Sequence, residues 1–238
     1  MKGNRGQASE MKILGINASP KGSKSQTLRL VQAALDGAAS MGCEVELVDL
    51  CNLKIEYCNA CGICHKKGKC YKKDDFQALY RKMLAADGLV MGSPNYFLSV
   101  TAQMKTLIDR MAYAVHCQLF AGKYTVNVAT SGGVGRDRQV TKYLDTLMLT
   151  FGSFITGSAG VSVRLGSEAM EAAERKSFRL GKKLAADIRS RRVYKKQEII
   201  HRETGEYFRQ LVTMNKNEWA HEYEFWRRAS KSRSVKVR

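Results

Sequence analysis

The sequence predicts an α/β fold in which one parallel sheet is covered by helices on both faces. Between residues 12 and 191, apolar runs typical of buried strands alternate five times with amphipathic stretches typical of helices. The two prolines, Pro20 and Pro94, and the pair Gly132-Gly133 all follow directly on such apolar runs. Sheets of this kind bind ligands beyond the carboxyl ends of their strands, so these loops are where a site is expected.

Each element is predicted from its own local pattern. Strands are expected over residues 12–18, 43–50, 88–92, 124–129 and 155–163, because these runs are apolar or alternate in polarity. Helices are expected over residues 26–42, 74–86, 101–116, 137–151 and 167–191, where apolar residues recur at three- and four-residue steps. Asp74 and Asp75 stand where they would cap the second helix. A further amphipathic helix is expected from Tyr194 to Arg228.

Charge divides the chain unevenly. Of a formal net charge of +18, residues 189–238 contribute 14 Lys and Arg against six Asp and Glu. We therefore expect a polar N-terminal extension over residues 1–10, a domain over 11–191, and a basic helical tail over 192–238. The first ten residues hold no apolar signal-peptide core, and no apolar run is long enough for a membrane span. With seven cysteines, these features favour a reducing cytoplasm over a secreted disulfide framework.

Four closely spaced cysteines are the most specific motif of the chain. Cys58, Cys61, Cys64 and Cys70 follow the pattern C-x2-C-x2-C-x5-C, and small or flexible residues between them allow the backbone to curl. Four thiolates suit an iron–sulfur cluster. A zinc site is the main alternative, with His65 as a further ligand, although zinc loops usually combine two separated C-x2-C pairs. A redox-active loop without a metal is the third possibility.

The loop after the first strand is rich in hydroxyl groups. Residues 19–27 lead into a helix whose first turn offers unpaired backbone N–H groups and the positive end of its dipole, so a phosphate suits this loop. It matches neither the G-x4-G-K-[ST] pattern nor the G-x-G-x-x-G pattern of dinucleotide folds. A polar turn with good capping residues is the simpler interpretation of this loop on its own.

Three segments together resemble the FMN-binding loops of the NADPH-dependent FMN reductase family. They are residues 12–27, 92–110 and 130–133, and with the four cysteines the chain is similar to the iron–sulfur flavoproteins of that family. The resemblance extends over about residues 11–190 and leaves the tail unmatched. It implies a flavodoxin-like, doubly wound, five-stranded parallel sheet with the basic helical tail as a C-terminal extension.

The resemblance also implies roles for individual residues. It assigns the FMN phosphate to Ser19, Lys21, Ser25, Gln26 and Thr27. It places the flavin ring along Pro94, Asn95, Tyr96 and Phe97, and the pyrimidine edge at Ser131, Gly132 and Gly133. The four cysteines correspond to the ligands of a [4Fe-4S] cluster. Subunits of the family associate so that a cluster lies near a neighbour's flavin, so a homo-oligomer, a dimer or tetramer, is implied.

The function expected from these features is electron transfer through FMN and a [4Fe-4S] cluster. A flavin accepts electron pairs and a cluster passes single electrons, so the protein would connect NAD(P)H or ferredoxin to an acceptor. One alternative is an NAD(P)H-dependent FMN or quinone reductase without a working cluster. Another is a redox-sensing or nucleic-acid-binding flavoprotein that uses the basic tail. No catalytic proton-transfer residue is apparent.

The remaining features have simpler interpretations. Cys43, Cys51 and Cys117 are expected in the core. His116, His201 and His221 are expected to be isolated, because their spacing indicates no metal triad. Lysines around the cysteine motif could steer an acidic ferredoxin. The tail is expected to pack its aromatic side chains on a neighbouring subunit, in preference to binding nucleic acid.

Overall fold

The computed structural model describes residues 11–234, with side chains as far as Ala229, and this part of the chain contains a single parallel sheet. Its strands are β1 (Lys12–Asn17), β2 (Glu44–Asp49), β3 (Gly88–Pro94), β4 (Tyr124–Ser131) and β5 (Phe154–Ser162). They are ordered β2-β1-β3-β4-β5, and every neighbouring pair is parallel. The predicted five-stranded flavodoxin-like sheet is therefore confirmed. The predicted extension 1–10 lies outside the described residues.

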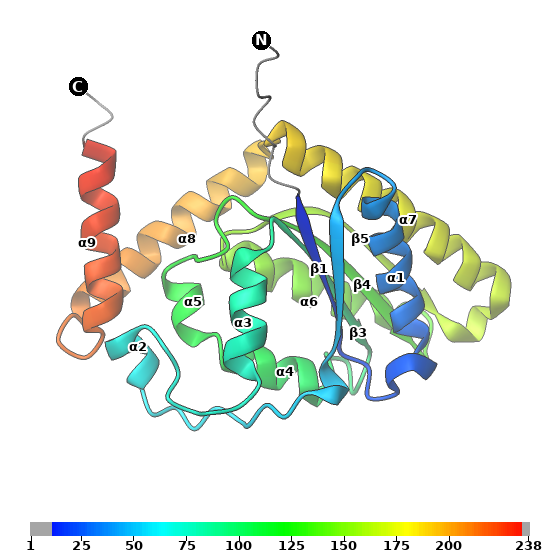
Figure 1. The fold of residues 1–238 in the computed structure, drawn as a ribbon, viewed down its shortest axis with the longest axis horizontal. Helices are drawn as coiled ribbons and strands as arrows, with labels where there is room; N and C mark the ends of the chain where they lie inside the picture. The colour runs from blue at the N-terminus through cyan, green and yellow to red at the C-terminus, as the bar shows by residue number, and fades with distance from the viewer. Residues whose placement is uncertain (1–10, 235–238) are drawn as a thin grey trace, which may run out of the picture.

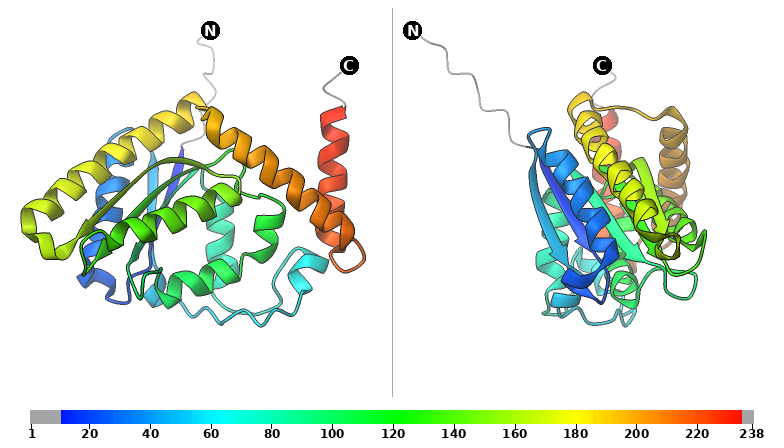
Figure 2. Two further views of the ribbon diagram at one scale, coloured as in Figure 1. Left: turned by 180° about the vertical axis from the view of Figure 1, so that it is seen from behind. Right: turned by 90° about the vertical axis from the view of Figure 1, so that its right-hand side faces the viewer.

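Helices cover both faces of the sheet (Figures 1 and 2). One face packs against α1 (Gln26–Ala39) and α7 (Gly166–Ser190), and the other against α3 (Phe76–Ala85), α4 (Ala102–Asp109), α5 (Ala112–His116) and α6 (Arg136–Thr150). The strands supply both cores because alternate residues point to opposite faces. Leu89 and Met91 enter the core under α3 and α4, while Val90 between them enters the core under α1.

The third predicted helix, residues 101–116, is broken in the structure. Thr101 caps α4 by accepting from the Met104 N–H, and α4 ends at Asp109. The shorter α5 begins at Ala112, after the fully buried Met111. The break turns the chain so that Met111 enters the core while the side chain of Arg110 reaches toward the cysteines.

The tail forms two helices instead of the single predicted one. α8 (Lys195–Met214) and α9 (Ala220–Ser234) are joined by a turn in which the Glu218 and Trp219 N–H groups donate to the Asn215 carbonyl. In Figure 1, α9 stands beside the short α2 (Ile63–Lys67) of the cysteine motif. Phe208 and Val212 of α8 are buried within their own chain, so the expectation that the aromatic face needs a neighbouring subunit is wrong for these residues. No described helix has the length and hydrophobicity needed to cross a membrane.

Candidate active site

The three loops predicted to hold FMN meet at the carboxyl edge of the sheet. The hydroxyls of Thr27 and Thr130 lie 2.6 Å apart, which joins the first loop to the third. The Asn95 N–H donates to the Thr130 carbonyl at 2.7 Å, and the Ala18 N–H donates to the Gly92 carbonyl at 2.8 Å. Strands β1, β3 and β4 are neighbours in the sheet, and hydrogen bonds between their ends make the three loops one continuous surface.

The first loop presents the start of α1. Ser25 is its N-cap and accepts from the Thr27 and Leu28 N–H groups at 3.0 and 3.2 Å. Ser19, Ser25 and Thr27 are almost fully buried, whereas Lys21 and Gln26 are exposed. The hydroxyls of Ser25 and Thr27 thus already have partners in the protein. The groups left for a phosphate are the first backbone N–H groups of α1 and the exposed side chains of Lys21 and Gln26.

The second loop contains a strained turn. Phe97 and Leu98 both have positive φ, 46° and 68°, between Tyr96 and Ser99, which exchange backbone hydrogen bonds of 2.9 and 3.0 Å. Two-residue turns of this kind favour Asn-Gly because bulky side chains are unfavourable at positive φ. The Phe97 side chain is fully exposed. Such strain is concentrated at functional sites, and here it presents an aromatic ring beside the predicted flavin segment.

The third loop leaves space in front of its backbone. The Ser131 hydroxyl donates to the Gly133 carbonyl at 2.6 Å and fixes the turn. A Cβ added at Gly132 would meet no atom within 4 Å, and Gly132 is not at a positive φ. The protein's own fold therefore does not require glycine at this position. An open backbone surface here fits the close approach of a flat ring such as flavin.

The cysteine motif forms a curled segment on the outside of the same edge. We call residues 58–70 the cysteine segment. It contains three residues at positive φ, Ala60 at 53°, Gly62 at 70° and Gly68 at 69°. Cys58 and Cys61 are exposed, Cys64 and Cys70 are half-buried, and none of them forms a disulfide. The Ala60 N–H donates to the Cys58 sulfur at 3.4 Å.

The thiols of the described residues are not gathered as four ligands of one ion would be. Four sulfurs around one zinc ion lie about 3.8 Å apart, given a Zn–S bond of about 2.3 Å. Among the described residues, no three cysteine sulfurs lie within 4.8 Å of one another. Burial raises the pKa of Cys64 to about 11, with further contributions from the charges of Cys70, Glu222 and Cys58. Positive charge bound between these thiols would relieve that repulsion, as the iron atoms of a cluster do.

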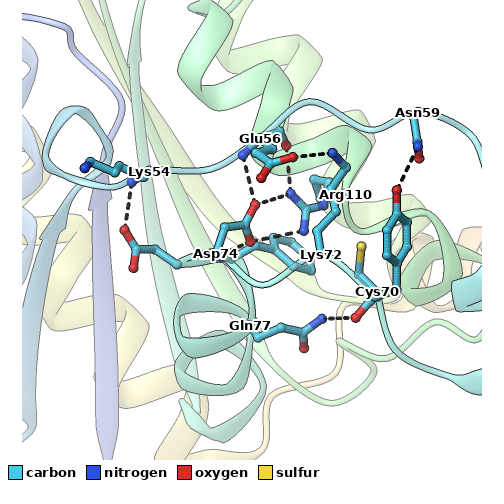
Figure 3. Close-up of polar contacts among 11 residues, drawn as sticks. Lys54, Glu56, Asn59, Cys70, Lys72, Asp74, Gln77 and Arg110 are labelled. Atoms are coloured by element: carbon cyan, nitrogen blue, oxygen red, sulfur yellow. Dashed lines mark hydrogen bonds and ion pairs between the residues drawn. The ribbon is translucent and has the colours of Figure 1, made fainter.

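A buried ion pair ties the cysteine segment to α4 (Figure 3). The Arg110 guanidinium donates to both carboxylate oxygens of Asp74, at 2.6 and 3.1 Å, and both side chains are at most 5% exposed. It also donates to the Glu56 carbonyl at 2.7 Å, and the Glu56 N–H donates to Asp74 at 2.9 Å. The predicted capping role of Asp74 and Asp75 is thus mostly wrong. Asp75 makes no side-chain capping bond, and Asp74 accepts weakly from the Phe76 N–H.

The same arginine has a donor to spare. Its Nε–H is buried and, within the described part of the chain, has no hydrogen-bond partner. Burial lowers the pKa of Arg110, but the hydrogen bonds and charges of Asp74 and the nearby Cys70 side chain more than offset this and raise it. Figure 3 shows the Cys70 sulfur beside the guanidinium. A buried cationic donor that faces a cysteine fits a negatively charged iron–sulfur group, because such a donor needs an acceptor.

The histidines are not isolated, contrary to expectation. His65 and His116 each place Nδ1 near one carboxylate oxygen of Glu222, at 2.6 and 3.0 Å. Burial raises the pKa of Glu222, but these hydrogen bonds more than offset it and lower the pKa. His201 donates to the Ser153 carbonyl at 3.1 Å. Sequence spacing could not reveal the grouping, because its members lie 51 and 106 residues apart.

The remaining cysteines and Arg110 complete the comparison of expected and observed positions. Cys43 and Cys117 are buried as predicted, but Cys51 is half-buried and lies near the first loop. Sequence reasoning assigned no role to Arg110. Its only signal was its position at the end of the longest segment that resembles the flavin-binding loops.

Comparison with known proteins identifies the family of this chain. The family model of NADPH-dependent FMN reductase matches residues 11–168. An iron-sulfur flavoprotein of Archaeoglobus fulgidus is 34% identical over 225 residues, covering 91% of this chain and 98% of its own. Another from Methanosarcina thermophila is 36% identical over 138 residues, covering 58% of this chain and 71% of its own. The chain belongs to the NADPH-dependent FMN reductase family, and it is an FMN-dependent oxidoreductase.

The comparisons also correct the expected extent of the resemblance. The A. fulgidus relative leaves 9% of this chain uncovered, which is too little to contain everything from Tyr194 onward. Part of the tail is therefore shared with that relative. Among solved structures, an NAD(P)H:quinone oxidoreductase from Methanothermobacter marburgensis has a TM-score of 0.59 at 20% identity. It covers 74% of this chain and 98% of its own, a likeness that shows the shared fold.

Gly132→Val tests the flavin site without disturbing the fold. The new side chain meets no protein atom near Cβ, so the melting temperature without flavin should change little. It fills the space that the flavin edge needs, so FMN bound per chain should fall at least about tenfold, as expected when overlap costs more than about 1.4 kcal/mol. Gly132→Ala should give an intermediate loss. Full FMN retention by the valine variant, measured from flavin absorbance after gel filtration, would contradict this placement.

Asp74→Asn tests the buried ion pair. It leaves a buried guanidinium without a counter-ion and should cost about 3–5 kcal/mol at pH 7. The folded-state pKa of Asp74 is lowered, so its contribution is present above the unfolded value of about 3.9 and disappears as the pH falls through the folded value. Urea unfolding should therefore separate wild type and variant at pH 7, and the difference should shrink as an acidic pH approaches the folded-state pKa of Asp74. A constant difference down to that pH would exclude an ionic contribution.

Proposed function

We propose that this oxidoreductase is an iron–sulfur flavoprotein that transfers electrons through FMN and a [4Fe-4S] cluster. FMN would accept an electron pair from NAD(P)H, or single electrons from ferredoxin, and the cluster passes electrons singly. The ligands of the cluster would be Cys58, Cys61, Cys64 and Cys70. The observation that carries the proposal is the buried Arg110–Asp74 pair, because it fixes the cysteine segment beside the helix that continues from the flavin-ring segment.

Two groups of residues at the carboxyl edge of the sheet would have separate roles, one toward the flavin and the other toward the cluster. The loops after β1, β3 and β4 hold and orient the flavin, and open backbone at Gly132 admits it. The guanidinium of Arg110 lies next to Cys70 and supplies positive charge and a buried N–H donor. Both stabilise added negative charge, which favours the reduced form of a neighbouring cluster.

The surface around the cysteine segment suits a charged electron partner. Lys66 is paired with Glu218 and Lys72 with Glu56, whereas Lys67, Lys69 and Lys73 are exposed. Exposed lysines beside the cysteines support steering of an acidic partner such as ferredoxin.

Two other features bear on assembly and location. The exposed apolar side chains Phe97, Leu98 and Val134 surround the flavin loops and support a homo-oligomer, a dimer or tetramer, in which a second copy covers them. Seven cysteines without a disulfide among them support a reducing cytoplasm.

Nucleic-acid binding by the tail is less well supported than electron transfer. Trp219 stacks on His65 and His116, and the Trp226 indole N–H donates to the His116 carbonyl, so these rings are engaged within the protein.

Cys64→Ser separates this proposal from a flavin reductase without a working cluster. Loss of one thiolate should remove or convert the cluster, while the distant flavin loops keep FMN. Hydride acceptance from NAD(P)H should persist, and reduction of a one-electron partner such as ferredoxin should fall at least about tenfold, a rise in barrier of about 1.4 kcal/mol.

Cys51→Ser is the matched control, because Cys51 is a half-buried thiol outside the motif. It should retain iron and both activities. Unchanged one-electron transfer by the Cys64→Ser protein after its iron is lost would favour the plain reductase.

A further inference from the structure

The C-terminal helix α9 lies against the cysteine segment through several independent contacts. Its Glu222 carboxylate is completely buried and bridges His65 of the cysteine segment and His116 of α5. At the turn before α9, Glu218 pairs with Lys66 at 3.0 Å. The tail was expected to face a neighbour, yet these contacts join it to the cysteines of its own chain.

Aromatic rings close the space around the buried carboxylate. Trp219 stacks on both imidazoles, with ring centroids 5.0 Å from His65 and 4.7 Å from His116. Phe208 of α8 packs on His116 at 5.3 Å. These rings exclude water from a charged group, so the carboxylate depends on the two histidines for its hydrogen bonds.

A second contact depends on the absence of a side chain at Gly68. A Cβ added there would lie 2.3–2.7 Å from three atoms of the His221 ring, so that ring rests directly on the backbone of the cysteine segment. Gly62 has almost the same φ, 70° against 69°, but a Cβ there would meet nothing within 4 Å. The two glycines therefore have nearly the same φ, but only Gly68 has a side chain of α9, that of His221, packed against it.

The geometry of the two histidines and Glu222 is that of hydrogen bonds. The three residues are near enough to suggest a metal site, since their ligand atoms lie within 4.8 Å of one another. Two ligands of one zinc ion, however, are about 3.3 Å apart at bond lengths of about 2.0–2.1 Å. The distances of 2.6 and 3.0 Å match N–H to carboxylate hydrogen bonds instead.

We propose that α9 holds the cysteine segment in the shape that binds the cluster, with Glu222 as the positioning residue. Glu222 acts through His65, the residue directly after Cys64, and so fixes the turn that presents this thiol. The part of the proposal that concerns the cluster rests on the proposed function. The docking of α9 on the cysteine segment does not.

Hydrogen exchange of the full-length, FMN-bound protein without iron tests the docking. Glu222→Ala should speed amide exchange in residues 61–68 at least about tenfold, because it removes the buried charged hydrogen bond that joins His65 to α9. Glu218→Ala removes an exposed ion pair between the turn before α9 and the cysteine segment, and should change the exchange little. Glu222→Gln can still accept from one imidazole and donate to the other, so it should restore most of the protection.

The glycine pair gives a test that leaves the carboxylate in place. Gly68→Ala and Gly62→Ala carry the same backbone strain, but only Gly68→Ala displaces His221. Faster exchange in residues 220–228 is therefore expected for Gly68→Ala alone. Equal exchange in both variants, or wild-type protection in Glu222→Ala, would overturn the proposal. If Glu222→Ala does not fold, the glycine pair decides.

Anaerobic reconstitution with iron and sulfide then tests the consequence for the cluster. Iron bound per FMN, and the electron paramagnetic resonance signal of the reduced protein, should fall in Glu222→Ala and recover in Glu222→Gln. Equal iron in all three proteins would overturn the positioning role. Absence of iron from the wild type would instead refute the proposed function and leave the exchange result standing.

Discussion

The ion pair between Arg110 and Asp74 is the interaction on which the arrangement of the site depends. Arg110 directly follows α4, the helix after the flavin-ring segment, and Asp74 lies four residues after the last cysteine. Burying two charges is costly unless the geometry is good and the remaining polar groups are satisfied. Here the pair is bidentate, and Glu56 contributes its carbonyl and N–H. These hydrogen bonds fix the position of the cysteine segment relative to the flavin loops.

The cysteine segment is held from two sides by groups of opposite charge. The cation of Arg110 lies near Cys70, and the anion of Glu222 influences Cys64. Arg110 belongs to the domain built on the sheet, and Glu222 to the C-terminal helix α9. A loop that carries four thiols has little apolar surface of its own to bury, so such charged contacts supply the order that a hydrophobic core cannot.

Much of the fold was predictable because its signals are local. Each strand is a short apolar run, each helix has its own period, and parallel sheets place successive strand ends at one edge. The cysteines were predicted as a group from their spacing, and the flavin loops from their resemblance to the FMN reductase family. The break after Asp109, the role of Arg110 and the cluster around Glu222 were not predicted. They depend on pairs such as Glu222 and His65, which are 157 residues apart and carry no periodic signal. The tail was misjudged for the same reason, since an aromatic face indicates burial but not the surface that buries it.

The most direct test of the account is the ratio of iron, acid-labile sulfide and FMN in the wild-type protein after anaerobic reconstitution and gel filtration. The account predicts about four iron and about four sulfide per FMN, with loss of both in Cys64→Ser and retention in Cys51→Ser. One zinc ion per chain, or full FMN with no iron or sulfide, would contradict it.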